Sequence, residues 1–400
     1  MRIIFLHPHF TSAGGAGRAV LETGSRLAAR GHHVHCVCIR ADQRFVDGYA
    51  GIEFHETGGP LSSSLWFWLR FSASCKKFND AVNRIVSEAN AEPCVLYPQV
   101  FPANWWASEV LKQSPGLRCV WYCQEPSAFI HSQRWINALP LLKNWIAIIL
   151  RPLLLERDLR YCRSFNNVLV NSEYSRVQVQ KVYGYVDETV QRVYLGVDKR
   201  SVRSNDVAIR KPWITTIAKL TKFKNVDVII RAIAILVSAG RTDVRLQVVG
   251  EGDASESLRE LARSLGLAEY VVFHGYVSDS QVTQILQQSK VFCLASVDEP
   301  FGLVAIEALS CGTPVVAVNR GGPKEIVASH GCGLLVDMPT PESLAHAFDC
   351  ILKPNTDFEK LSRAAETRAL DFNWDRTTDQ LEQIFVKATQ SSEAAKPGEF

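Results

Sequence analysis

Short apolar segments alternate with helical patterns along most of this 400-residue chain, and this alternation restricts the fold more than any other feature. Near the start, apolar runs at 2–7 and 32–39 flank a helical pattern at 19–31, which ends at Gly31. A strand, a helix and a second strand in this order form a β-α-β unit, in which the two strands lie parallel in one sheet.

The second half of the chain repeats this order with greater regularity. We expect strands at 213–218, 244–249, 270–273, 291–295 and 314–318, separated by helices at 226–240, 256–265, 279–288 and 302–310. In the first half, further strands are expected near 94–97, 118–122 and 167–170. The sequence therefore predicts an α/β protein with two Rossmann-like domains, which we expect to face each other across a cleft.

The polar stretch at 198–211 has no hydrophobic period and is the best candidate for a linker between the two domains. It separates an N-terminal domain at 1–197 from a C-terminal domain at 212–372. A final helix at 373–390 is expected to pack back on the N-terminal domain. Both domains then have an ordinary size, since domains usually contain about 100–200 residues.

Composition and charge exclude several classes of protein. Hydrophobic residues make up 47% and charged residues 21% of the chain, as in an ordinary globular protein. The net charge of +3 is too small for a nucleic-acid-binding protein, which usually carries a concentrated basic surface. The 11 cysteines are scattered without a Cys-x-x-Cys pair, so we expect reduced thiols. The first apolar run is too short for a signal peptide and no uncharged run reaches about 18 residues, so we expect a cytoplasmic location.

The stretch at 291–317 is the most typical of a ligand site, with the sequence VFCLASVDEPFGLVAIEALSCGTPVVA. A buried strand runs into a turn, and a helix begins near Leu303, where free N–H groups are suited to a phosphate or to sugar hydroxyls. Glu299 lies on the turn, at the end of the strand where open α/β sheets bind ligands, and Glu307 lies about one turn into the helix. Both carboxylates can accept hydrogen bonds from hydroxyls. The alternative is a helix cap at Glu299 and a solvated helix residue at Glu307.

The order of the motifs along the chain resembles that of a known family. The chain contains, in order, GGAGRAVLETGSRLAARGHHV, LVNSEYSRVQVQKVYG, VYLGVD, IAKLTKFKNVD, VVGEGD and VFHGYV. The two glutamates follow, and then CGTPVVA and GGPKEIV. This series covers nearly the whole chain and is similar to the fourth sequence family of glycosyltransferases, the glycosyl transferases group 1, which are retaining enzymes of the GT-B fold. Each motif is weak alone, whereas the ordered series is highly specific.

The resemblance implies transfer of a hexose, with retention of anomeric configuration, from a nucleoside diphosphate sugar to a glycan or lipid-linked acceptor. It places the acceptor on the N-terminal domain and the donor on the C-terminal domain. The YC-x-EP stretch slightly resembles mannosyltransferases, so GDP-mannose is the first candidate donor and UDP-glucose the second, and no cofactor is implied. Two alternatives remain open: a sugar-nucleotide epimerase of the same fold, and a nucleotide-binding module without catalytic activity.

The chain has no Asp-x-Asp pair to hold a divalent cation, so cationic side chains are expected to stabilise the leaving diphosphate. Lys219 and Lys224 stand where the family places an arginine and a lysine, and the alternative is that both are surface lysines. Lys219 replaces a planar, bidentate guanidinium with a point charge, and Asn225 replaces a usual glycine. The resemblance implies a metal-free site in which both lysines hold the diphosphate. Glu299 would hold the sugar and Glu307 the ribose.

Further donor contacts are expected from glycines and from strand ends. Gly14 and Gly15, in a loop after the first strand, would let the backbone approach the donor phosphates. The alternatives are a simple turn or a dinucleotide-binding fingerprint, although the third glycine of that fingerprint falls at Val20. The segment at 273–277 would line the base pocket or belong to the core. The remaining donor-binding candidates are Gly250, Tyr276, Val277, Phe301, Gly302 and Leu303.

The YCQEP stretch departs from the family. Gln124 stands where many relatives carry a histidine that is thought to contact the transferred sugar. Glutamine can donate and accept hydrogen bonds but cannot carry a proton during catalysis. This is tolerable where the leaving phosphate takes the proton of the acceptor, so Gln124 remains a catalytic candidate. Glu125 is a further candidate or a helix cap, and His131 is expected to be a surface residue.

Two apolar segments of the N-terminal domain, at 64–71 and 137–155, combine aromatic and aliphatic bulk with Arg134, Lys143 and Arg151. A lipid-linked acceptor at an anionic membrane surface would account for them, and so would core helices. We therefore expect a nucleotide sugar and a glycan or lipid-linked acceptor as partners, and no nucleic acid. Peripheral association with the inner face of the membrane is left open.

Overall fold

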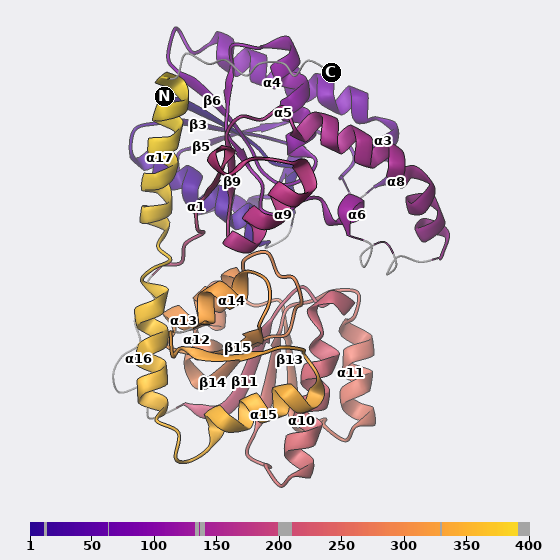
Figure 1. The fold of residues 1–400 in the computed structure, drawn as a ribbon, viewed down its shortest axis with the longest axis vertical. Coiled ribbons are helices and arrows are strands. Elements are labelled where there is room, and N and C mark those ends of the chain that lie inside the picture. The colour runs from indigo at the N-terminus through magenta and orange to yellow at the C-terminus, as the bar shows by residue number, and fades with distance from the viewer. Residues whose placement is uncertain are drawn as a thin grey trace. The chain divides into compact units, whose positions relative to one another are not determined.

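The computed structural model describes residues 1–11, 14–62, 64–132, 136, 141–198, 210–328 and 330–390. They form two compact units (Figure 1). The N-terminal unit comprises the residues up to Leu195 together with the last helix, and the C-terminal unit comprises Gly196–Asn373. Most of the expected linker, at 199–209, lies outside the described residues, while Arg210 and Lys211 belong to the C-terminal unit.

The N-terminal unit is built on a five-stranded parallel sheet with the order β5-β3-β1-β6-β7. Its strands are β1 (Arg2–Leu6), β3 (His33–Cys38), β5 (Ile52–Glu56), β6 (Cys94–Pro98) and β7 (Arg118–Cys119). Two smaller parallel sheets contain β2 (His9–Phe10) with β4 (Arg40–Ala41), and β8 (Trp121–Tyr122) with β9 (Val168–Val170) and β10 (Val190–Arg192). The predicted β-α-β unit is confirmed, because β1 and β3 are parallel neighbours.

Helices connect these strands and surround the sheet. They are α1 (Gly15–Ala29), α2 (Gln43–Val46), α3 (Leu65–Leu69), α4 (Phe71–Ser87), α5 (Ala103–Gln113), α6 (Ala128–His131), α8 (Leu141–Cys162), α9 (Glu173–Tyr183), η1 (Asp187–Thr189) and α17 (Trp374–Gln390). The prediction of a glycine loop before the first helix is wrong in part. Helix α1 begins at Gly15, so Gly15 and Gly17 are helical residues and only Gly14 precedes the helix.

The single strand predicted at 118–122 is also wrong, because the chain changes its strand partner at Val120. The Val120 N–H donates to the carbonyl of Leu96 at 2.9 Å. One residue later, the Trp121 N–H donates to the carbonyl of Asn167 at 2.9 Å. The segment therefore forms two short strands, β7 and β8, in two different sheets.

Helices cover both faces of the N-terminal sheet. A side chain at Gly24 of α1 would contact Val34 and Ile52, so α1 covers the face that carries these residues. Val37 has the opposite parity on β3 and packs in one core cluster with Phe78 of α4. Because successive side chains of a strand point to opposite faces, α4 covers the other face of the sheet.

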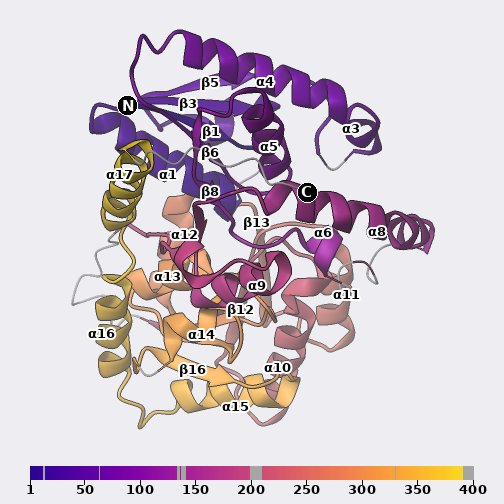
Figure 2. The ribbon, with the colours of Figure 1, turned by 45° about the horizontal axis from the view of Figure 1, so that its top comes forward.

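The last helix, α17, spans most of the segment at 373–390 and belongs to the N-terminal unit. It lies beside α1 (Figure 2). The Arg30 guanidinium of the loop after α1 is 2.9 Å from the Glu382 carboxylate. The rings of Phe385 and Tyr97 meet edge to face at a centroid distance of 4.9 Å. The helix therefore adds an ion pair and buried aromatic surface to this unit.

The C-terminal unit contains one six-stranded parallel sheet with the order β13-β12-β11-β14-β15-β16. Its strands are β11 (Lys211–Ile217), β12 (Arg245–Val249), β13 (Val271–Gly275), β14 (Ser289–Leu294), β15 (Val315–Val318) and β16 (Gly333–Val336). Its helices are η3 (Lys222–Lys224), α10 (Val226–Ser238), α11 (Ser255–Ser264), α12 (Asp279–Gln288), α13 (Leu303–Ser310), α14 (Gly322–Val327), α15 (Pro341–Leu352) and α16 (Phe358–Ala369). The five strands and four helices predicted here are confirmed, and only β16 has no counterpart among the predicted strands.

This strand order places a topological switch point in the middle of the sheet. From β11 the chain moves outward to β12 and β13, then returns to the other side of β11 and continues through β14 to β16. The loops after β11 and β14 leave the sheet at its carboxyl edge in opposite directions, and this is where sheets of this kind bind ligands. Both predicted lysines and both predicted glutamates follow these two strands.

Candidate functional site

The structure brings Lys224 and Glu299 together at the switch point. Lys224 ends the short helix η3 after β11, and Glu299 lies on the turn between β14 and α13. The Lys224 Nζ atom is 2.7 Å from the Glu299 Oε2 atom, and the two side chains are 29% and 18% exposed. The pair is therefore partly shielded from water but accessible to a ligand. The alternative was a surface lysine, whereas Lys224 is half-buried and paired with Glu299.

Asn225 explains how Lys224 is held in this position. Asn225 has φ 51°, in the left-handed region that glycine adopts easily and asparagine tolerates. Its Nδ2 atom donates a hydrogen bond to the carbonyl of Ala295 at 2.8 Å, directly after β14. Asparagine therefore keeps the backbone shape of the usual glycine and also ties the β11 loop to the end of the neighbouring strand.

Two consecutive glycines support the turn that carries Glu299. The Gly322 N–H donates to the Glu299 carbonyl at 2.8 Å. A Cβ atom at Gly321 would lie 2.5 Å from the same carbonyl oxygen, and one at Gly322 would overlap the backbone of Phe301. The available sequence signal is the Gly-Gly pair of GGPKEIV, which the resemblance alone identifies only as a family motif. Its physical role is to let α14 approach the Glu299 turn.

Helix α13 excludes the alternative interpretations of the two glutamates. Its N-cap is Gly302 with φ 102°, and no side chain caps the helix, so Glu299 is not a helix cap. Glu307 is 6% exposed, so it is not a solvated helix residue. Phe301 is 3% exposed and packs edge to face on Phe372, so its side chain belongs to the core. Only its backbone remains for a donor contact. The half-buried Leu303 provides the first helical N–H group.

The loops after β11 and β12 approach each other closely beside Lys219. Gly250 has φ 114°, and a Cβ atom there would overlap the Ala218 carbonyl oxygen. A Cβ atom at Gly252 would overlap the Leu220 carbonyl in the same way. Lys219 lies between these two carbonyl groups along the chain and is exposed. Within the described residues it forms no hydrogen bond or ion pair, which leaves its ammonium group available to a ligand.

Tyr276 and Val277 lie one strand further from the switch point, after β13. Tyr276 is 63% exposed and Val277 is half-buried. The Tyr276 N–H donates to Glu251 Oε1 at 3.4 Å, so Glu251 links the loop after β12 to the loop after β13. These residues therefore follow the same edge of the sheet as Gly250.

The N-terminal unit holds the remaining candidates. Gly14 precedes α1 and Gly15 begins it, and both are exposed. Among the described residues, a Cβ atom at Gly14 would meet nothing within 4 Å beyond its chain neighbours, so packing against them does not require glycine there. Gln124 is 9% exposed, and its Nε2 atom donates to the Gln99 Oε1 atom at 3.2 Å. Gln124 follows β8 and Gln99 follows β6, so both lie at strand ends.

His7 is a candidate that the sequence interpretation missed. It follows β1 directly, is 4% exposed, and its ring packs on Phe10 at a centroid distance of 4.6 Å. Burial and the neighbouring His9 lower the pKa of His7 to about 3, so the ring is neutral at pH 7. Its Nδ1 atom has no hydrogen-bond partner in the described part of the chain. The available signal was a histidine directly after the first apolar strand.

The expectation that His131 is a surface residue is wrong. Its side chain is 13% exposed, and its Nε2 atom is 2.7 Å from Asp158 Oδ2. Asp158 is fully buried and also accepts hydrogen bonds from Trp105 Nε1 at 2.6 Å and the Tyr183 hydroxyl at 2.9 Å. A buried carboxylate with three donors of this kind ties α5, α6, α8 and α9 together. His131 therefore has a structural partner.

Comparisons with known proteins agree with this architecture. The family model described as Glycosyltransferase Family 4 matches residues 13–201, and the model described as Glycosyl transferases group 1 matches residues 199–368. A D-inositol 3-phosphate glycosyltransferase of Rhodococcus opacus is 30% identical over 239 residues, which are 56% of this chain and 54% of that protein. This alignment therefore spans about half the length of the relative.

Two further proteins match over nearly their whole length. The N-acetyl-alpha-D-glucosaminyl L-malate synthase of Bacillus anthracis is 24% identical over 395 residues, 97% of each chain. The HepE protein of Anabaena, solved in complex with UDP and glucose, superimposes with a TM-score of 0.75 and 18% identity, covering 96% of this chain and 99% of that chain. The two family models match adjacent parts of the chain, and GT-B structures match nearly all of it. This chain therefore belongs to the group 1 glycosyltransferases of the GT-B fold.

Proposed function

We propose that this chain transfers a hexose from a nucleoside diphosphate sugar, with retention of configuration and without a metal ion. The observation that carries the proposal is the pair formed by Lys224 and Glu299 at the switch point of the C-terminal sheet. A leaving diphosphate needs positive charge, and a sugar offers hydroxyls to a carboxylate. On donor binding, the Lys224 ammonium moves from Glu299 to the diphosphate, and the freed carboxylate accepts hydrogen bonds from the sugar.

The surrounding residues divide the rest of the donor among them. Lys219 adds a second positive charge from the neighbouring loop, and the first N–H groups of α13 after Gly302 face the phosphates. Glu307, shielded one turn into α13, accepts hydrogen bonds from the ribose. The exposed Tyr276 and the half-buried Val277 border the base, beside Gly250.

The proposed reaction needs no protein base. The acceptor hydroxyl oxygen bonds to the anomeric carbon while the bond from that carbon to the diphosphate oxygen breaks, on the same face of the sugar. The hydroxyl proton passes to the diphosphate oxygen that is leaving. Gln124 supports this account, because an amide can hold a sugar hydroxyl but cannot carry the proton. Its bond to Gln99 would fix the direction of the amide. Gly14 and Gly15 remain proposed contacts to the donor phosphates.

We propose the chemical class of the donor, a nucleoside diphosphate sugar, and rank candidate donors within it. The YC-x-EP stretch favours GDP-mannose, with UDP-glucose next. The comparisons add two further candidates, because one relative is named for an N-acetyl-alpha-D-glucosaminyl product and one fold neighbour was solved with UDP and glucose. We therefore rank UDP-glucose and UDP-N-acetylglucosamine with GDP-mannose as the donors to test.

An exposed apolar stripe supports a lipid-linked acceptor at a membrane surface. Trp145, Ile149 and Leu153 of α8 are 64%, 70% and 65% exposed, and their i, i+4 spacing places them on one side of the helix. Leu154 and Leu155 of the same helix pack against the core, so the helix has one core-facing side and one exposed apolar side. In the segment at 64–71, Phe67 is buried and serves the core, whereas Trp66 on α3 is exposed. Such surface is unusual unless something covers it.

We propose that the protein is cytoplasmic and that this stripe contacts the inner face of a membrane without crossing the bilayer. Among the helices that the structure describes, none combines the length and apolarity that a bilayer span requires. Arg134 and the side chain of Lys143, which we expected to add charge here, lie outside what the structure describes. Arg151 is half-buried, and its Nε atom donates to the Ile130 carbonyl at 3.1 Å.

The test is a donor screen with product analysis. UDP-glucose, UDP-N-acetylglucosamine and GDP-mannose are titrated into the purified chain by calorimetry, and each mixture is then analysed for free nucleoside diphosphate and free sugar. We expect one donor to bind and to release its diphosphate slowly by hydrolysis in the absence of acceptor. An isomerised sugar would support the epimerase instead. Tight binding without sugar loss would support the nucleotide-binding module.

A further inference from the structure

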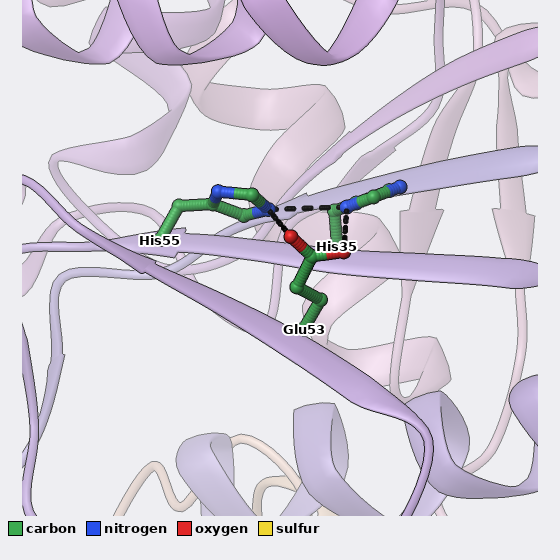
Figure 3. Close-up of side chains that lie close together, drawn as sticks. All are labelled: His35, Glu53 and His55. Atoms are coloured by element: carbon green, nitrogen blue, oxygen red, sulfur yellow. Dashed lines mark hydrogen bonds and ion pairs between the residues drawn. The ribbon is translucent and has the colours of Figure 1, made fainter. Parts of the chain in front are cut away.

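Three polar side chains converge on the edge of the N-terminal sheet, in the unit that lacks Lys224 and Glu299 (Figure 3). His35 lies on β3, and Glu53 and His55 lie on the edge strand β5. The parallel register pairs His35 with Glu53 and Val37 with His55. Because side chains alternate along a strand, all three polar groups point to the same face of the sheet.

Their ligand atoms lie within 4.8 Å of one another, which is close enough for one ion to contact all three. His35 Nδ1 is 3.0 Å from His55 Nε2 and 3.3 Å from Glu53 Oε2, and His55 Nε2 is 3.5 Å from Glu53 Oε1. In a tetrahedral zinc site with bonds of about 2.0–2.2 Å, ligand atoms are separated by about 3.3–3.6 Å. The distances to the two Glu53 oxygens already match this separation, and the two imidazole nitrogens need to move apart by only a few tenths of an ångström to share an ion.

The exposure of the three side chains defines the kind of site. His35 is 7% exposed and His55 is partly buried, whereas the Glu53 side chain is 66% exposed. An ion would be enclosed on the side of the sheet and open to water on the side of Glu53, so a water molecule can complete the tetrahedron. Two imidazoles and a carboxylate suit zinc and other late transition metals better than magnesium or calcium, which prefer oxygen ligands alone.

We propose that His35, Glu53 and His55 bind a zinc ion that ties the edge strand β5 to β3. The ion would stabilise the N-terminal unit and take no part in transfer, because His35 and Glu53 lie within β3 and β5, whereas the proposed contacts Gly14 and Gln124 lie in loops after strands. The His35 Nε2 atom has no hydrogen-bond partner among the described residues. Since a partner at that position usually strengthens a metal site, its absence should weaken zinc binding about 10–100-fold relative to a fully supported site.

A neighbouring histidine provides a matched control. His33 is on the same strand and the same face as His35, but its Nδ1 atom is 2.9 Å from the Glu92 carboxylate. Glu92 also pairs with Arg2 at 3.1 Å, so His33 belongs to a separate ion-pair network. His33→Gln should therefore leave zinc binding unchanged.

One rival zinc site must be removed first. On α15, Cys350 Sγ is 3.6 Å from His346 Nε2, and this thiol is only partly buried. The experiment therefore uses the full chain with Cys350→Ser, stripped with a chelator and dialysed. Zinc sulfate is then titrated by calorimetry, and thermal unfolding is followed with and without zinc. Cobalt chloride serves as a second probe, since tetrahedral cobalt absorbs visible light strongly.

The expected result is one zinc ion per chain, a rise of several degrees in the unfolding temperature, and the visible bands of tetrahedral cobalt. His55→Gln and Glu53→Gln should each weaken zinc binding at least about 10-fold, the scale of losing one ligand contact, while His33→Gln should bind as the parent does. Glu53 is largely exposed, so Glu53→Gln tests the site without disturbing the core. Failure of the Cys350→Ser chain to bind zinc would overturn the proposal, and so would unchanged binding in both His55→Gln and Glu53→Gln.

Discussion

The two units support their candidate residues in different ways. In the C-terminal unit, the backbone approaches so closely around the site that several positions require glycine. Lys224 and Glu299 form an ion pair between two adjacent loops. In the N-terminal unit, packing does not require Gly14, and the buried His7 Nδ1 atom has no partner among the described residues. The comparison teaches that contacts within the C-terminal unit hold its candidate residues in place, whereas packing constrains Gly14 of the N-terminal unit much less.

The largest expected effect is on catalysis by the C-terminal unit. Lys224→Ala should lower turnover by roughly 30–1000-fold, which corresponds to about 2–4 kcal/mol for one preorganised charge contact. Lys222→Ala is the matched control, because Lys222 is an exposed lysine of the same short helix. Release of nucleoside diphosphate from the donor is the measurement. A change of less than about threefold in Lys224→Ala would remove the lysine from the proposed site.

A second prediction compares how much stability is lost when one glycine of each unit is replaced by alanine. Gly250→Ala forces a Cβ atom into the Ala218 carbonyl at a left-handed φ, so it should reduce the free energy of unfolding by more than about 2 kcal/mol. Gly14→Ala meets open space and should change stability by less than about 0.5 kcal/mol. Denaturant titrations of both variants measure the difference. Equal losses would contradict the comparison between the units.

A third prediction separates the two carboxylates of the donor site. Glu299→Gln should lower kcat about 10-fold or more, because charge develops on the sugar in the transition state. Glu307→Gln should instead raise the donor KM, because the ribose does not change during the reaction. Calorimetry with the free nucleoside diphosphate provides the check, since only Glu307→Gln should weaken that binding. Exchanged effects would mean that sugar and ribose are assigned the wrong way round.

The smallest expected effect concerns Lys219. Lys219→Arg restores the fork that the family normally uses, so activity should stay within about threefold of the parent or rise. Lys219 is exposed and forms no pair with a described residue, so the larger side chain has room. Steady-state rates with the preferred donor measure the effect. A drop beyond about 10-fold would show that the geometry around Lys219 differs from that of its relatives.

The sequence predicted regular elements well and irregular ones poorly. Alternating apolar and helical patterns located β11 to β15, because each strand is a short apolar run bounded by helical patterns. Strand β16 was not predicted, because it has only four residues and is partly exposed at the edge of the sheet. The segment at 118–122 was misjudged as one strand, because an apolar pattern does not reveal that the chain changes partner at Val120.

The candidate site was predictable in its residues but not in its contacts. Glu299 and Lys224 were identified from motifs, whereas their ion pair depends on β11 and β14 being neighbours, which follows from strand order rather than from local pattern. The support of the Glu299 turn by Gly321 and Gly322 is equally non-local. His7 was missed because burial, rather than sequence position, determines its state.

The central claim is transfer without a metal ion, and chelation tests it most directly. The purified chain is treated with excess EDTA, and donor turnover is compared with untreated chain and with chain given back manganese. The account predicts equal rates in all three, because Lys219, Lys224 and the start of α13 stabilise the diphosphate. Any bound zinc at His35, Glu53 and His55 would then affect the unfolding temperature and leave turnover unchanged. Loss of turnover in EDTA with recovery in manganese would contradict the account.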